Sequence, residues 1–397
     1  MRTTPNWPHA APDGLMASLL LSFLATAGLY YVNIMPALVE GLKTGLHFTD
    51  AQAGMSGSAN VYGAAAGALV ATLIVTQVDW RRAAYVLLAL LISIDIASIF
   101  IHSAALMIAV RACHGFFGGL LVGIAFSVIA RTRRPERTFG MLLVVQDGLG
   151  GLGVMLLPQW VPLLGTPVLF MVLIAFSIIT LAMIPFLDVY PRQQSNQMTN
   201  GNNLQWSPLV CAMLSVFLFQ FSNMVLFAYI IGLAKYFSLQ PGHAADIVGI
   251  SAWIGIIGSI LVIMIATRFG RARTLMIALL LTGLGMWLLH ASANAVWYAV
   301  ANCGTAITWS FVIPYLLGMC AKFDSSGRAA AFGGFSSKMG LATGPLVGGI
   351  MASSGHYELL INVAVVCIFV CAIVAIYPAR VLDQRDRALV NVDARIA

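Results

Sequence analysis

Charged residues are scarce in this sequence. Asp, Glu, Lys and Arg together make up 9% of the chain, whereas hydrophobic residues make up 60%. A soluble globular domain usually has about a quarter of its residues charged. The composition therefore excludes an ordinary soluble protein and indicates one whose surface faces lipid.

The sequence also lacks the common motifs of ATP hydrolysis, metal binding and catalysis. It contains no GKS or GKT run, no HExxH, no Ser-His-Asp order and no CxxC pair. Its six cysteines lie in apolar segments, and Cys367 and Cys371, which share a helical face, are explained best as small buried apolar residues. We therefore expect no enzyme activity, no metal and no cofactor.

Long apolar segments are present instead. A helix needs about 20 mostly apolar residues to cross the roughly 30 Å hydrocarbon core of a bilayer. Open sheets cannot satisfy their backbone in lipid, and the segments are too long and too uniformly apolar for a barrel. The sequence predicts an all-α integral membrane protein with twelve transmembrane helices, at approximately 15–40, 51–76, 82–101, 105–131, 138–163, 167–187, 208–235, 244–266, 273–290, 295–321, 329–352 and 358–378.

Basic residues indicate the orientation in the membrane. Lys43 and Lys235 fall on one side of the predicted spans, while the other basic loop residues fall on the side of both termini. Lys and Arg in short loops are retained in the cytoplasm. We expect cytoplasmic termini in the cell inner membrane, and the net charge of +7 then reflects topology, so nucleic acid is not an expected partner.

One polar segment divides the chain. Residues 188–207 are rich in Gln, Asn and Ser, a composition that cannot bury enough surface to fold. The first span is too long for a cleaved signal peptide, so we expect it to remain. The predicted organisation is an N-terminal tail at 1–14, a six-helix bundle at 15–187, a cytoplasmic linker at 188–207, a second six-helix bundle at 208–378 and a C-terminal tail at 379–397.

The two halves repeat one short pattern. Residues 109–113 read AVRAC and residues 299–303 read AVANC, and each copy is followed at similar spacing by a charged residue in the next span, Asp147 in the first half and Lys338 in the second. The copies therefore differ mainly in charge, which is costly inside a bilayer. This duplication predicts two pseudo-symmetric bundles.

Each half also has a basic hairpin between its second and third spans. Together with the two six-span halves and the polar linker, these hairpins resemble those of the major facilitator superfamily over essentially the whole chain. Arg111 with Gly115 and Gly119 resembles that family's span-4 motif, and residues 344–349 (GPLVGG) resemble the Gly-Pro motif of its antiporters. The resemblance implies a monomeric secondary transporter whose conformational hairpins contain Asp79, Arg81, Arg82, Arg268, Gly270, Arg271 and Arg273.

The chain departs from that family at two places. Thr76 and Thr267 stand where the family's hairpins usually open with Asp; Asp79 could substitute in the first half, and no residue substitutes in the second. Span 5 has several glycines but no Gly-Pro pair, since Pro158 follows Leu157. These departures disfavour a drug/proton antiporter.

Three titratable residues are expected to meet between spans 3 and 4. Asp95 and Arg111 lie at similar distances on either side of the turn at residues 102–104, so they have the same depth. His114 shares the helical face of Arg111. The three are candidates for proton coupling, and a structural ion pair explains them equally well.

Asp147 and Lys338 are expected near mid-bilayer, where transporters place substrate and ion sites. The family resemblance implies that their spans border a central cavity, where Lys338 would attract an anionic group and Asp147 would exchange a proton or bind a cationic group. The alternative is that one or both pack against polar groups in the interior. A mid-span charge costs about 2.5–3.5 kcal/mol to insert, which disfavours a charge without a function.

Uncharged polar residues could complete a binding site. Each one alone is explained better by helix–helix hydrogen bonding, but their number favours a wet cavity, which the resemblance implies is lined by spans 1, 4, 7 and 10. The candidates for contact with substrate are Tyr30, Tyr31, Asn33, Asn60, Gln146, Gln220, Asn223, Asn302 and Trp309.

These observations predict a secondary active transporter of a small organic solute, coupled to protons as symporter or antiporter, with an organic anion favoured as substrate. Lys338 and Arg111 favour the anion. Proton-driven efflux of hydrophobic or amphipathic compounds is the alternative, and a membrane enzyme acting on a lipid-linked substrate is a weaker one. The solute, protons and the lipid bilayer are the expected partners.

Overall fold

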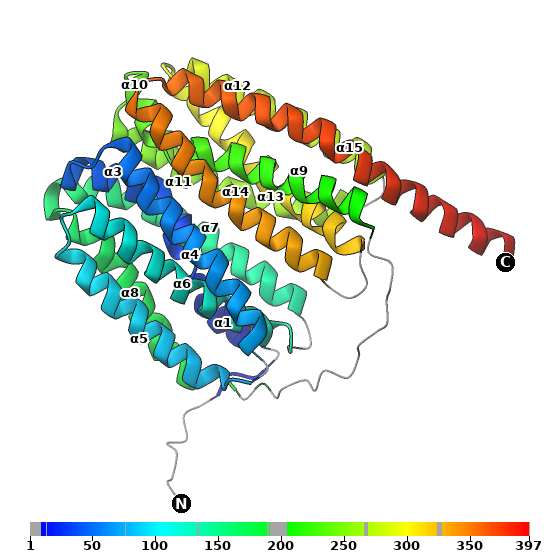
Figure 1. The fold of residues 1–397 in the computed structure, drawn as a ribbon, viewed down its shortest axis with the longest axis horizontal. Coiled ribbons are helices and arrows are strands. Elements are labelled where there is room, and N and C mark those ends of the chain that lie inside the picture. Colours follow the sequence, from blue (N-terminus) through cyan, green and yellow to red (C-terminus); the bar gives the residue numbers. More distant parts are fainter. Residues whose placement is uncertain are drawn as a thin grey trace, which may run out of the picture. The chain divides into compact units, whose positions relative to one another are not determined.

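The chain is helical throughout the part that the structure describes. The computed structural model describes residues 9–12, 14–75, 77–132, 135–188, 190, 205–265, 269–323 and 328–396. Within these ranges it contains α-helices and two 3-10 helices and no β-strand (Figure 1). The all-α fold predicted from the apolar segments is confirmed.

The first half of the chain forms the helices that carry Asp95, Arg111 and Asp147. They are α1 (Leu15–Ala27), α2 (Tyr30–Asn33), α3 (Met35–Leu46), α4 (Asp50–Ile74), α5 (Trp80–Ile99), α6 (Ala104–Ile129), α7 (Pro135–Leu164), α8 (Pro167–Met183) and the 3-10 helix η1 (Ile184–Phe186).

The second half repeats this arrangement and carries Lys338. Its helices are α9 (Trp206–Phe227), α10 (Ile230–Tyr236), α11 (Pro241–Ile265), α12 (Arg271–Leu288), the 3-10 helix η2 (Leu289–Ala291), α13 (Ala295–Lys322), α14 (Arg328–Ser353) and α15 (Tyr357–Ile396).

Ten of the described helices are long and apolar enough to cross a membrane. The two predicted spans outside this set correspond to α1–α3 and to α14. The first is broken into short helices. Pro36 lies at the start of α3, and since a proline has no N–H for the helical ladder, it accounts for the break between α2 and α3. The helix α14 is rich in glycine and serine. The total of twelve spans stays a prediction.

Contacts divide the chain into two compact units. One unit contains residues 1–48 and 55–195, and the other contains residues 49–54 and 196–397. The first turn of α4 thus packs with the second unit, where the Tyr229 hydroxyl lies 3.0 Å from the Asp50 carbonyl oxygen and the Tyr357 hydroxyl donates to Asp50 Oδ1 at 3.2 Å.

Within the first unit, α4 and α6 approach until their backbones touch. A Cβ atom added at Gly63 would lie 2.1 Å from the Ala112 carbonyl oxygen, and one added at Gly115 would lie 1.8 Å from the Asn60 carbonyl oxygen. Real Cβ atoms do not come this close to backbone. Small residues at such crossings allow close helix packing in lipid, and this contact sets the position of the Asn60 side chain against α6.

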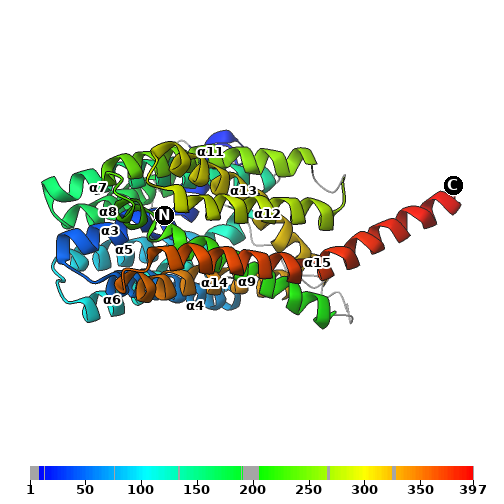
Figure 2. The same cartoon turned by 90° about the horizontal axis from the view of Figure 1, so that it is seen from above.

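Within the second unit, α9 packs between α14 and α15 (Figure 1). The helix α15 does not end near residue 378, where the predicted span ends; it continues through Pro378 to Ile396. Its C-terminal end projects beyond the other helices of this unit (Figure 2). The segment predicted as a tail is therefore helical through residue 396.

Candidate functional site

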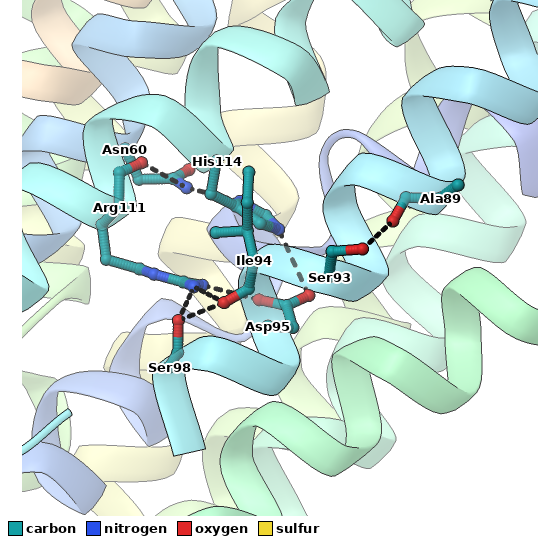
Figure 3. Close-up of polar contacts among 8 residues, drawn as sticks. All are labelled: Asn60, Ala89, Ser93, Ile94, Asp95, Ser98, Arg111 and His114. Carbon is teal, nitrogen blue, oxygen red and sulfur yellow. Dashed lines mark hydrogen bonds and ion pairs between the residues drawn. The ribbon is translucent and has the colours of Figure 1, made fainter. Parts of the chain in front are cut away.

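A cluster of buried polar side chains occupies the contact of α5 and α6, and we call it the Asp95 cluster. It contains Asp95 and Ser98 on α5, Arg111 and His114 on α6, and Asn60 on α4 (Figure 3). The side chains of Asp95 and Arg111 are 0% exposed. The hairpin geometry predicted from the sequence brings its three residues together.

Asp95 accepts a hydrogen bond from Arg111 and lies close to His114, both on α6. Arg111 Nη1 donates to Asp95 Oδ1 at 2.8 Å, and His114 Nε2 lies 3.3 Å from Asp95 Oδ2. Arg111 Nη2 donates to the Ser98 hydroxyl. One positive and one negative charge thus neutralise each other, which is how buried charges are usually tolerated.

Two aromatic rings complete the surroundings of Arg111. The guanidinium carbon lies 5.2 Å from the Phe170 ring centroid and 5.7 Å from the Tyr31 ring centroid. A cation is attracted to an aromatic face at this distance. Tyr31 and Asn60, expected as substrate contacts, therefore lie in the Asp95 cluster, and both are buried.

Asp147 on α7 has different surroundings. It is half-buried and makes no hydrogen bond or ion pair with any other described residue. A Cβ atom added at the adjacent Gly148 would meet nothing within 4 Å, so there is open space beside it. Asn33 on α2 packs against Gly150, which lies on α7 like Asp147. The buried Nδ2 atom of Asn33 has no hydrogen-bond partner among the described residues.

Lys338 on α14 is the corresponding residue of the second unit. It is also half-buried, and its ammonium group has no hydrogen bond or ion pair to another described side chain. Gly334, one turn earlier, has open space where a Cβ would lie. Asp147 and Lys338 thus share two features: a charge in a helix predicted to cross the membrane and no protein partner in the part described.

Next to Lys338, three helices of the second unit are joined by a chain of hydrogen bonds. Trp309 Nε1 on α13 donates to Gln220 Oε1 on α9 at 3.0 Å, and Gln220 Nε2 donates to the Ser337 hydroxyl on α14 at 2.9 Å. The indole can only donate, so it sets the orientation of the Gln220 amide. The Ser337 hydroxyl is then free to donate its own proton elsewhere.

The remaining predicted polar residues lie apart from this chain. Tyr30 donates to the Leu149 carbonyl oxygen at 3.1 Å. The amides of Asn223 and Asn302 each donate to the carbonyl oxygen one turn earlier in their own helix, at 2.8 Å. Gln146, beside Asp147, is half-buried. The Tyr30 hydrogen bond joins α2 to α7, whereas those of Asn223 and Asn302 lie within single helices.

The sequence profile of the Major Facilitator Superfamily matches residues 17–212 and 212–394, one match to each half. The chain belongs to the major facilitator superfamily. It is therefore a multi-pass membrane transporter, as the span pattern and the repeat predicted.

Solved structures agree with this assignment at the level of the fold. The structure of the nucleoside transporter NupG has a TM-score of 0.67 with 14% sequence identity, covering 92% of this chain and 98% of that one. A mutant of the same transporter has a TM-score of 0.69 with 16% identity, covering 91% and 98%. Among curated protein sequences, none matches this superfamily member significantly.

The first basic hairpin of this superfamily member is held by its own aspartate. Asp79 Oδ1 accepts from the backbone N–H groups of Arg81 and Arg82, at 2.9 and 3.4 Å, and so caps the start of α5. Arg81 donates to the Leu187 carbonyl oxygen near the end of the first bundle. An aspartate at this position satisfies backbone donors that have no partner within the helix.

The second hairpin is held by an aspartate from elsewhere in the chain. Asp383 on α15 accepts from the backbone N–H groups of Arg271 at 2.8 Å and Ala272 at 3.0 Å. Gly270 precedes them with a φ of 77°, and a Cβ there would lie 3.1 Å from Asp383 Oδ2. The sequence offered no carboxylate within this hairpin, and the one that caps α12 comes from a distant helix. Arg268 and Thr267, like Thr76 in the first hairpin, lie outside the described residues.

We expect Asp383→Ala to lower the free energy of unfolding by about 1 kcal/mol, since the loss of a capping carboxylate typically costs 0.5–2 kcal/mol. The measurement is thermal or denaturant unfolding of the purified protein in detergent.

Asp386→Ala serves as the matched control for this prediction. Asp386 lies 2.6 Å from Arg271 Nη1 but is 45% exposed, so its removal should have the smaller effect. The hydrogen bond from Arg271 lowers the pKa of Asp386. Its contribution is therefore present above the ordinary pKa of Asp and is lost as pH falls through the lowered value. An equal effect of both substitutions would contradict capping by Asp383.

Sequence reasoning missed several residues of these sites. Ser98 and Ser337 are common helix-face serines whose partners are known only from the fold. Asp383 lies outside the span predicted for α15, and Glu40, buried on α3 with Lys43 at 3.4 Å, was not singled out. Of these residues, only Glu40 could have been identified from the sequence, since an acidic residue within a predicted span indicates a functional site.

Proposed function

We propose that this superfamily member is a proton-coupled secondary transporter of a small organic anion in the cell inner membrane, and that it works as a monomer by alternating access. The observation that carries the proposal is the pair of charges described above. Asp147 and Lys338 each lie half-buried, in a helix predicted to cross the membrane, without a protein partner among the described residues. A charge placed so costs several kcal/mol, and such residues mark substrate and ion pathways.

Lys338 is proposed to attract the anionic group of the solute. Its ammonium is a compact charge on a flexible stem, and open space at Gly334 leaves room beside it. The Ser337 hydroxyl, whose oxygen accepts from Gln220, offers a neighbouring donor. Trp309, half-buried at the end of the same hydrogen-bonded chain, offers an aromatic surface.

Asp147 is proposed to carry the coupling proton. A carboxylate that alternates between two environments takes up a proton in one and releases it in the other, which is how carboxylates act in pumps and transporters. Asn33 Nδ2, which lacks a partner among the described residues, could donate to a bound solute or to the carboxylate after movement. The Asp95 cluster is less suited to this role because its charges already neutralise each other.

Two other substrate classes are alternatives. Efflux of an amphipathic cation would use Asp147 as the binding charge and leave Lys338 without a role. Nucleosides are the substrates that the titles of the similar NupG structures name, and a neutral nucleoside would leave both charges for coupling. The membrane-enzyme alternative would require a nucleophile or a metal site near an interface.

Uptake into proteoliposomes with an imposed pH gradient tests the proposal. The panel should contain small mono- and dicarboxylates, aromatic carboxylates, amino acids, nucleosides and amphipathic cations. Accumulation of an anion that reverses with the sign of the gradient is the expected result. Accumulation of cations alone would replace the proposal by efflux, and transport insensitive to the gradient would refute proton coupling.

Lys338→Ala is expected to raise the KM for the anion about 10–100-fold, because a hydrogen-bonded contact to a charged group contributes about 1.5–3 kcal/mol. The measurement is the concentration dependence of initial uptake. Lys338→Arg keeps the charge and should retain most of the affinity. Lys235→Ala, which removes an exposed lysine of α10, is the control, and an unchanged KM in Lys338→Ala would contradict the assignment.

A further inference from the structure

The Asn60 amide contacts two atoms of α6 through the same nitrogen. Asn60 Nδ2 lies 2.9 Å from His114 Nδ1 and 3.3 Å from the Arg111 carbonyl oxygen. The backbone carbonyl can only accept a hydrogen bond. The atom facing it must therefore be the amide nitrogen, and rotating the amide by half a turn would place Oδ1 against another oxygen.

This orientation determines which nitrogen of His114 carries the proton. Since Asn60 Nδ2 can only donate, His114 Nδ1 must accept and cannot carry a proton. The proton of the neutral ring then lies on Nε2, the ring nitrogen that is 3.3 Å from Asp95 Oδ2. A second proton on His114 would place an N–H against the N–H groups of Asn60.

Among the residues that the structure describes, no other charged or titratable group compensates for such a second proton. The groups that face His114 are Asp95 from α5, Arg111 from its own helix and the Tyr31 ring from α2, whose centroid lies 6.0 Å from that of the imidazole. Asp95 is already paired with Arg111, and Asn60 from α4 is neutral. A doubly protonated His114 would thus leave a net positive charge in a fully buried cluster, which is strongly unfavourable.

We propose that Asn60 is a positioning residue that fixes His114 as the neutral ring with its proton on Nε2, and that it thereby keeps the Asp95 cluster from taking up a proton while α4 and α6 are in contact. The backbone contacts at Gly63 and Gly115 hold the amide in place. Separation of α4 from α6 would remove the donor from His114 Nδ1. The ability of the cluster to accept a proton is therefore tied to the packing of these two helices.

Nitrogen-15 NMR of histidine-labelled protein in lipid tests this directly, because the chemical shifts of the two ring nitrogens distinguish both neutral tautomers and the doubly protonated ring. The chain has seven histidines, and the signals missing in His114→Gln identify those of His114. We expect the His114 signals at neutral pH to show a proton on Nε2 alone.

Asn60→Asp provides the matched change. The carboxylate has the shape of the amide but only accepts, so it supplies a partner for a proton on Nδ1 and a compensating charge. We expect His114 to become doubly protonated at neutral pH in this variant. Asn302→Asp, a change at an amide that bonds only its own helix, should leave the His114 signals unchanged.

Two results would overturn the proposal. The first is a parent protein whose His114 carries its proton on Nδ1, or is doubly protonated, at neutral pH. The second is a folded Asn60→Asp variant whose His114 remains singly protonated. If Asn60→Asp does not fold, the parent spectrum alone still decides the tautomer. The test requires no substrate, so its outcome is independent of the proposed transport function.

Discussion

Asp147→Asn is expected to abolish solute accumulation driven by a pH gradient while leaving exchange of solute across the membrane intact. A pH difference of one unit supplies about 1.4 kcal/mol for each proton moved, which supports about a tenfold solute gradient at one-to-one coupling. Asparagine has the shape of aspartate but takes up no proton in this range. The expected solute gradient therefore falls from about tenfold to none.

The measurement compares uptake under an imposed pH gradient with counterflow, in which labelled solute exchanges for unlabelled solute without net proton movement. Glu358→Gln, which removes an exposed carboxylate at the start of α15, is the control and should accumulate solute as the parent does. If Asp147→Asn still reaches the tenfold gradient, the coupling proton is carried elsewhere. If it also loses counterflow, Asp147 contributes to solute binding.

Arg111→Leu is expected to prevent accumulation of folded protein. Removing one partner of a fully buried ion pair typically costs 3–5 kcal/mol, because the other charge remains buried and uncompensated. Here the uncompensated group would be Asp95, which would keep only its contact with His114. This cost is a large fraction of the total stability of a typical protein. The measurement is the yield of monodisperse protein in detergent and its melting temperature.

Two double variants separate structure from proton transfer. Asp95→Leu with Arg111→Met removes both charges and should recover much of the folded yield, since a well-packed apolar pair often replaces a buried ion pair without loss. The charge swap Asp95→Arg with Arg111→Asp should largely preserve transport if the pair is structural. Folded protein without transport in the swap would show that the orientation of the pair is used in the mechanism. A stable Arg111→Leu single variant would contradict the electrostatic account.

The Asp95 cluster shows what sequence reasoning could reach. Two charges at equal distances from a tight turn lie at the same depth if the adjacent segments are antiparallel helices, so Asp95 and Arg111 were predicted as a pair. Asn60 was expected to contact substrate, which stays a prediction, and the structure shows its amide against His114. Nothing in the local sequence indicates this contact, because it depends on how α4 is rotated about its axis.

The second hairpin shows the opposite case. Gly270 and Arg271 were identified from the local motif, but the carboxylate that caps α12 comes from Asp383. The two residues lie far apart in the chain, and the contact exists only because α15 continues as a helix beyond the apolar segment and runs beside α12. An estimate of the span from hydropathy stops where the apolar residues stop, although the helix does not.

The amino-acid sequence by itself determined the membrane location, the helical class, the duplication and the superfamily. These follow from apolar length, charge distribution and repeated motifs, which are properties of the chain read in order. The tertiary structure alone decided which polar side chains have partners. It showed that Asp95 and Arg111 pair with each other, that the Asn60 amide lies against His114, and that Asp147 and Lys338 have no partner among the described residues. The reason is physical: in a low-dielectric interior the cost of a charge depends on the atoms within a few ångströms, and helix rotation and packing choose those atoms.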